Sequence, residues 1–211
     1  PGGELEFGLS YIDKPDSRDA HRGWAITTQH VQKDFLGGKN KLAFQYGEWP
    51  GTGLGYTGNV KLDDSNKSYR IVEFFDWQVT PRFGGQIEAV YQKDIRPDGA
   101  DQNWLSLGVR PTYALTEQFK LVTELGHDQV EAPGGTRKLS KFTVAPTWSP
   151  KGPEFWARPE VRLYYTYASW NEAAKRAANE LAQGSALSDT GAFGTARHGA
   201  NVGLQVEYWW K

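Results

Sequence analysis

Cysteine and methionine are both absent from this chain of 211 residues. The lack of cysteine excludes disulfides, thiolate metal sites and cysteine nucleophiles. No run of about 18 apolar residues occurs, so no stretch of the sequence predicts a transmembrane helix. Blocks of like charge are missing too. The total charge is nearly balanced, with 24 Lys+Arg against 25 Asp+Glu. That balance argues against nucleic acid as a partner.

Aromatic residues and glycine are abundant. The chain has 9 Trp, 10 Tyr, 10 Phe and 24 Gly. Yet hydrophobic residues make up only 38% of it, and the mean hydropathy of −0.63 is that of a soluble protein. A membrane β-barrel reconciles these values, because half of each strand faces water or the lumen and only the other half faces lipid.

Alternation of apolar and polar residues is the dominant pattern, and turn residues interrupt it at regular intervals. Most alternating segments reach the roughly 9–11 residues that a tilted membrane strand needs. The sequence therefore predicts an all-β fold, an antiparallel transmembrane barrel. We expect ten strands, at residues 4–12, 22–32, 39–49, 67–79, 82–93, 102–115, 118–130, 138–149, 156–170 and 199–210.

Short and long connections alternate between these strands. Short turns on one side and long loops on the other are typical of outer-membrane barrels, whose long loops lie outside the cell, so both chain ends are expected on the periplasmic side. Asn171 predicts the N-cap of a helix over residues 172–181 that ends near Gly184. Short turns are expected near 36–38, 80–81, 115–116 and 149–152, and long loops at 13–21, 50–66, 95–101, 132–136 and 171–198.

Two faces follow from the alternation. The expected lipid face carries apolar residues: Leu5, Phe7, Leu9, Tyr11, Leu42, Phe44, Tyr46, Leu105, Leu107, Val109, Tyr113, Val161, Leu163, Tyr165 and Tyr167. The opposite face carries charges of both signs, which predicts a hydrated lumen. For the strand at residues 67–79, the alternation does not decide which face is turned to lipid, because Glu73 and Asp76 fall on opposite faces. At the end of the chain, Tyr208 and Trp210 continue the apolar face, and Trp209 turns to the other.

Five motifs, in this order, resemble those of the maltoporin family of sugar-specific outer-membrane porins. They are Pro1-Gly-Gly-Glu-Leu-Glu-Phe-Gly-Leu-Ser-Tyr11, Gly108-Val-Arg-Pro-Thr-Tyr113, Trp156-Ala-Arg-Pro159, Tyr167-Ala-Ser-Trp-Asn-Glu172 and Glu207-Tyr-Trp-Trp210. The resemblance implies a homotrimer of roughly 18-stranded barrels, of which residues 1–211 are the C-terminal part. Open sheet edges are not tolerated in lipid, so the remaining strands are expected upstream; closure of this piece alone is the alternative.

The two ends of the sequence add to this expectation. The start at Pro1, with neither an initiator methionine nor a signal peptide, indicates a mature or internal beginning. Lys211 departs from the aromatic terminus of the family.

The resemblance also implies a line of aromatic side chains along the lumen wall on which sugars stack. Trp156 and Trp209 match two of its positions, and alternation independently turns both inward on adjacent strands. The alternative is that both belong to the tryptophan girdle at the membrane interface. At a third position, after the Gly37-Gly38 turn, Lys39 replaces the aromatic residue of the family, so stacking there is lost. Either the substrate preference differs from the family's, or the local alignment is shifted by one residue.

Charged residues of the inward face resemble the polar tracks that bind sugar hydroxyls in this family. The candidates are Arg110, Glu124, Arg158, Glu160, Arg162 and Glu207. Each could instead be a wall charge that only holds its neighbours in place. The narrow constriction of the family, with its inward-folded loop, is expected in the portion outside this chain.

Other signals are weak. The four histidines are scattered, Gly51–Gly58 has no following helix to make a phosphate loop, and Asp63-Asp64 is interpreted as a solvated pair. Glu160 and Glu207 show no sign of a glycosidase pair. We expect no enzyme activity, cofactor or metal.

The function predicted is passive diffusion of maltodextrin-like or related oligosaccharides, with ions, through the bacterial outer membrane. A glycan-binding sheet without a pore, or a self-contained ten-stranded barrel enzyme, are the alternatives. A lipid-facing band on every strand disfavours the first, and the lack of a catalytic cluster in the loops disfavours the second.

Overall fold

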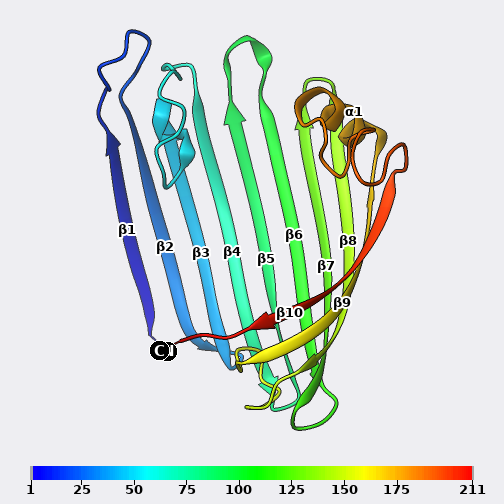
Figure 1. Ribbon diagram of the computed structural model, residues 1–211. Coiled ribbons are helices and arrows are strands. Elements are labelled where there is room, and N and C mark those ends of the chain that lie inside the picture. The colour runs from blue at the N-terminus through cyan, green and yellow to red at the C-terminus, as the bar shows by residue number, and fades with distance from the viewer. Residues whose placement is uncertain (1, 211) are drawn as a thin grey trace.

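The computed structural model describes residues 2–210 as one antiparallel sheet of ten strands in sequence order (Figure 1). Each strand pairs with the next along the chain, from β1 to β10. Their bounds are β1 Gly3–Ile12, β2 Gly23–Phe35, β3 Gly38–Glu48, β4 Lys67–Thr80, β5 Phe83–Ile95, β6 Gln102–Ala114, β7 Phe119–Ala132, β8 Gly135–Trp148, β9 Glu160–Trp170 and β10 His198–Glu207. The predicted all-β antiparallel fold is confirmed, and within residues 2–210 the sheet is not closed into a barrel.

The pairing register separates an apolar face from a polar face. On the apolar face, one row of paired residues runs across the first four strands from Phe7 through Thr28 and Phe44 to Ile71. Phe7 at its end is 71% exposed. Glu73 lies on this apolar face, opposite Leu42 and Ala89, where Asn40 donates a hydrogen bond to it. Asp76 lies on the polar face, opposite Gln86, in the row that continues to Arg110. The register thus resolves the ambiguity of this strand.

The polar face is the concave one. The sheet curls so that β9 and β10 pass in front of the middle strands in Figure 1. Trp156, which precedes β9, donates a hydrogen bond to Asp76 on β4 at 3.1 Å. Strands β4 and β9 are five positions apart in the sheet, so their residues meet only across its concave side.

The two ends of the sheet differ, as Figure 1 shows. The turn end, at the bottom of the view, holds both chain ends and the short links at 36–37, 81–82 and 115–118. The loop end, at the top, holds residues 13–22, 49–66, 96–101 and 171–197. The expected lengths of two connections between strands are wrong. Only Pro133 and Gly134 join β7 to β8 at the loop end, because the ladder continues to Ala132 and Gly135.

The second wrong length is at the turn end, where the connection from β8 to β9 spans residues 149–159. Pro150, Pro153 and Pro159 each lack the N–H that a ladder position requires, so β9 starts at Glu160 instead of at residue 156. Strand β10 ends at Glu207, which pairs with Glu160. Residues 208–210 have no partner on β9, because β9 starts only at Glu160. The last strand therefore ends three residues before the expected end at residue 210.

The connection from β3 to β4 folds inward onto the polar face. Its 3-10 helix η1 (Trp49–Gly53) contacts β2, β3 and β4, and Leu54 is only 2% exposed. The Leu54 carbonyl accepts hydrogen bonds from Gln45 Nε2 at 2.8 Å and Arg70 Nη2 at 3.4 Å, both on that face. The sequence pattern did not predict that this loop packs against the sheet.

Glycines explain this packing. A Cβ on Gly51 would lie 1.9 Å from the carbonyl oxygen of Trp24, and one on Gly47 would lie 2.1 Å from the carbonyl oxygen of Gly51. Backbone therefore packs directly on backbone where the loop meets β2 and β3, which only glycine permits.

Helix α1 (Glu172–Leu181) is the helix expected in the last loop. The Asn171 side chain caps it by accepting a hydrogen bond from the Ala174 N–H at 3.0 Å. In residues 2–210, no helix is long and apolar enough to cross a membrane.

Candidate functional site

The predicted pair of tryptophans comes together at the turn end of the concave face. The Trp156 and Trp209 rings have their centroids 5.9 Å apart and their planes inclined at 40°. Both remain about half exposed, at 48% and 49%. Strands β9 and β10 are adjacent, as expected, yet neither tryptophan lies on its strand. Strand alternation therefore does not explain how Trp156 is oriented.

Trp156 is held by the connection between β8 and β9. Phe155, 8% exposed, donates its backbone N–H to the Gln78 side chain at 3.1 Å, and the Trp156 indole N–H reaches Asp76. The Phe155 and Trp156 rings meet edge to face at 4.9 Å. Residues 149–159 thus form a strap, the name used below, that crosses the concave face from β9 to β4.

Trp209 is held from the other side by an arginine. The Arg158 guanidinium carbon lies 4.7 Å from the centroid of the Trp209 ring, a cation–π arrangement. Arg158 Nε and Arg162 Nη2 reach Glu207 at 3.1 and 2.7 Å. The other two aromatic residues of the C-terminus, Tyr208 and Trp210, contact each other edge to face at 5.0 Å. Trp209 alone of the three therefore joins the charged site.

Beneath the aromatic pair is a buried ion cluster. Glu160 is 2% exposed, and Lys120 Nζ and Arg158 Nη1 lie 2.9 and 3.3 Å from its Oε2. Arg162 also pairs with Glu160. Lys120, 1% exposed, further donates to the Glu154 carbonyl at 2.9 Å and so fixes the strap from below. We call Lys120, Arg158, Glu160, Arg162 and Glu207 the buried cluster.

Lys120 was missed by the sequence analysis, although its parity with Glu124 on the expected strand 118–130 placed it on the charged face. Nothing in that pattern distinguishes a lysine covered by a strap from one that faces water.

A second ion cluster lies higher on the concave face. Arg110 donates to Glu124 through Nε and Nη2 at 2.8 and 2.6 Å, and Lys141 Nζ lies 2.6 Å from the other oxygen of Glu124. The Arg110 and Lys141 side chains are 40% and 43% exposed, unlike those beneath the strap. A hollow of about 90 Å³ opens beside them at Gly108. We call Arg110, Glu124 and Lys141 the open cluster.

Lys39 lies on the concave face opposite Lys33, and its backbone N–H donates to Asp76 at 2.5 Å.

The predicted site residues fall into three groups: the aromatic pair, the buried cluster and the open cluster. Glu160 and Glu207, which showed no sign of a glycosidase pair in the sequence, are both bound by arginines. Among residues 2–210, no group of three or more His, Asp or Glu side chains could hold a metal ion.

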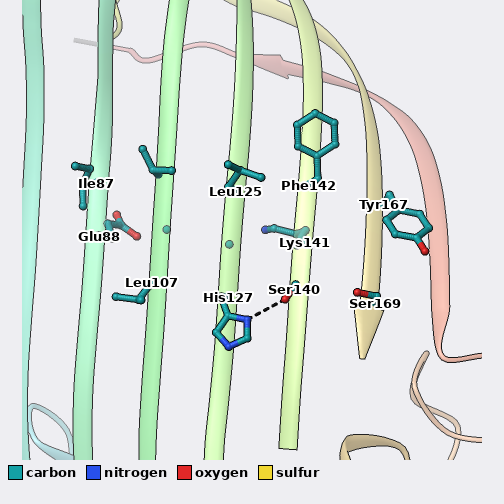
Figure 2. A pocket seen from close by; sticks show the side chains of 13 residues that line it. Ile87, Glu88, Leu107, Leu125, His127, Ser140, Lys141, Phe142, Tyr167 and Ser169 are labelled. Carbon is teal, nitrogen blue, oxygen red and sulfur yellow. Dashed lines mark hydrogen bonds between the residues drawn. The ribbon is translucent and has the colours of Figure 1, made fainter. Parts of the chain in front are cut away.

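A larger hollow, about 530 Å³, lies on the apolar face and is separate from this site. Figure 2 shows Ile87, Leu107, Leu125 and Phe142 along its wall, with the hydrogen bond between His127 and Ser140 at one edge. Most of the lining surface is apolar, as expected of a surface against lipid, although Glu88, His127, Ser140, Lys141 and Ser169 also border the hollow.

A sheet of membrane-length antiparallel strands, apolar on one face and charged with half-exposed tryptophans on the concave other, defines a porin-type outer-membrane protein. The family model of the LamB porin matches residues 1–210. The chain therefore belongs to the LamB porin, or maltoporin, family. The family resemblance is confirmed, and the family as a whole consists of sugar-selective porins of the bacterial outer membrane.

Proposed function

We propose that this chain forms the C-terminal wall of a channel through which maltodextrin-like oligosaccharides diffuse passively, and that sugars stack on Trp156 and Trp209. The half-exposed aromatic pair on the charged concave face carries this proposal. A pyranose ring has an apolar C–H face that rests on an aromatic plane. Its hydroxyls meet Arg158 and Glu207 beside the rings, and Arg110 and Glu124 further along the lumen.

Transport requires that binding at each position is weak. A sugar enters only if each site attracts it and leaves only if no site holds it tightly. Two half-exposed rings backed by charges meet both needs. Glu160 is buried, at 2% exposure, and Arg162 pairs with both Glu160 and Glu207. In this proposal these two residues act mainly by holding Arg158 and Glu207 in place.

The rest of the barrel belongs to the same proposal. Strands β1 and β10 each pair on one side only within residues 2–210. Unpaired strand edges are costly in lipid, so further strands complete a barrel of about 18, and three such barrels form the trimer implied by the family.

Sugar block of single channels tests the proposal. In planar bilayers that contain the fully assembled protein, maltotriose should interrupt the ion current. Trp156→Ala and Trp209→Ala should each shorten the sugar's residence about tenfold, which corresponds to about 1.4 kcal/mol of lost binding, and leave ion conductance nearly unchanged.

Trp148→Ala is the matched control, because Trp148 is similarly exposed, at 42%, but lies on the apolar face opposite Val161. It should leave the sugar block unchanged. Wild-type current that maltotriose does not interrupt would refute the channel function. An unaltered block in both test variants would return these tryptophans to the interfacial girdle.

A further inference from the structure

The Trp156 indole owes its orientation to a residue 80 positions earlier in the chain. Its Nε1–H donates to Asp76 Oδ2 at 3.1 Å, and the other oxygen, Oδ1, accepts the Lys39 backbone N–H at 2.5 Å. Asp76 is 8% exposed. Each carboxylate oxygen is therefore engaged, one by the strap and one by β3.

Asp76 is held in place independently of the strap. A Cβ on Gly38 would lie 2.0 Å from the Asp76 carbonyl oxygen, and one on Gly37 would lie 2.4 Å from the Gln78 carbonyl oxygen. The Gln78 N–H donates to the Leu36 carbonyl at 3.2 Å. The glycine turn thus packs directly against the end of β4, which gives the carboxylate a fixed place from which to accept the indole.

Packing covers only about half of the Trp156 side chain. Trp156 touches Phe155 edge to face and Trp209 at an inclined angle, and almost half of its surface stays open. The hydrogen bond to a carboxylate is charge-assisted, hence stronger than a neutral one. Among residues 2–210, no other hydrogen bond to this ring occurs.

We propose that Asp76 is a positioning residue, which holds the Trp156 ring at the angle to Trp209 that lets a sugar pass from one ring to the other. The inference rests on the proposed function, because it concerns how the same aromatic pair works. Asp76 does not touch the sugar. Through the ring it sets how long a sugar stays at the turn end.

A double-mutant cycle in the assembled protein tests this role. Trp156→Phe keeps an aromatic ring but removes the indole N–H, and Asp76→Ala removes its acceptor. In maltotriose current-noise measurements, each change alone should shorten the residence time about fivefold, which corresponds to about 1 kcal/mol. The double variant should lose no more than Trp156→Phe alone, since both changes break the same bond.

Asp128→Ala is the matched control. Asp128 accepts the Trp104 indole N–H at 3.4 Å on the neighbouring strands β7 and β6. Its effect on residence time should be the same in the wild type and in Trp156→Phe. In an indole NMR spectrum, Asp76→Ala should move the Trp156 Nε1–H signal, which Trp156→Phe assigns, while Asp128→Ala leaves it in place.

The outcomes separate the two proposals. If Asp76→Ala shortens residence equally in the Trp156→Phe background, Asp76 acts through the β3 turn and the positioning role is overturned. An unchanged residence time or an unmoved indole signal would overturn it too. If maltotriose fails to block even the wild-type channel, the proposed function itself fails, and the inference with it.

Discussion

The buried cluster and the open cluster contain the same kinds of side chain on the same face of the same sheet, yet they differ in what covers them. In the buried cluster, Lys120 and Glu160 lie under the strap at 1% and 2% exposure. In the open cluster, Arg110 and Lys141 stay about 40% exposed around Glu124. The first cluster is shielded from solvent by the strap, and the second is open to solvent on the concave face, where our proposal has it meet sugar hydroxyls.

The largest expected effect concerns the loss of Glu160. Glu160→Ala leaves Lys120 buried without its carboxylate, and removing one partner of a buried pair costs about 3–5 kcal/mol. The free energy of unfolding of the assembled protein in urea, in lipid vesicles, should fall by that amount. Glu124→Ala, its counterpart in the open cluster, should cost less than about 1 kcal/mol, because exposed pairs contribute little. Equal losses in the two variants would remove the distinction between the clusters.

An effect of intermediate size is expected from Arg110. Arg110→Ala should weaken maltotriose binding about twofold to thirteenfold, the range for one lost hydrogen bond of about 0.5–1.5 kcal/mol. It should leave the free energy of unfolding within about 0.5 kcal/mol of the wild type. Sugar titration of the channel current and urea unfolding measure the two quantities. A fall in stability with unchanged sugar binding would show that the open cluster is only structural.

The smallest effect is a difference in salt dependence. Between 0.1 and 1 M salt the Debye length shrinks from about 10 to about 3 Å, which weakens exposed pairs far more than buried ones. The stability lost in Glu124→Ala should shrink at high salt, and that lost in Glu160→Ala should stay constant. Paired unfolding curves at the two salt concentrations decide this, and parallel changes would contradict the assigned burial.

Most of the strands could be predicted from alternation, because a strand with one face in lipid and one in water must alternate. Where alternation predicted the strand bounds wrongly, the causes are local. The prolines at 150, 153 and 159 delay β9, and the end of β10 follows from that delay. The inward loop was missed because its glycines are also what a flexible loop contains. Only the packing at Gly47 and Gly51 tells the two apart.

The candidate site could be predicted in part. Both tryptophans were identified from motifs, and their approach to 5.9 Å agrees with the adjacent strands. The residues that hold them, Asp76, Gln78 and Lys120, belong to distant strands and carry no motif. Their contacts exist because the sheet curls, and a linear pattern does not record curvature.

By itself, the sequence determined the all-β fold, the strand order, the two faces and the family. These follow from side-chain alternation and turn residues, which act over a few neighbouring positions. The tertiary structure alone decided which charges are buried and which stay open, where the strap crosses the concave face, and how Trp156 is held. Those features depend on contacts between β4, β7 and β9, and such contacts arise only once the sheet has curved and brought distant strands face to face.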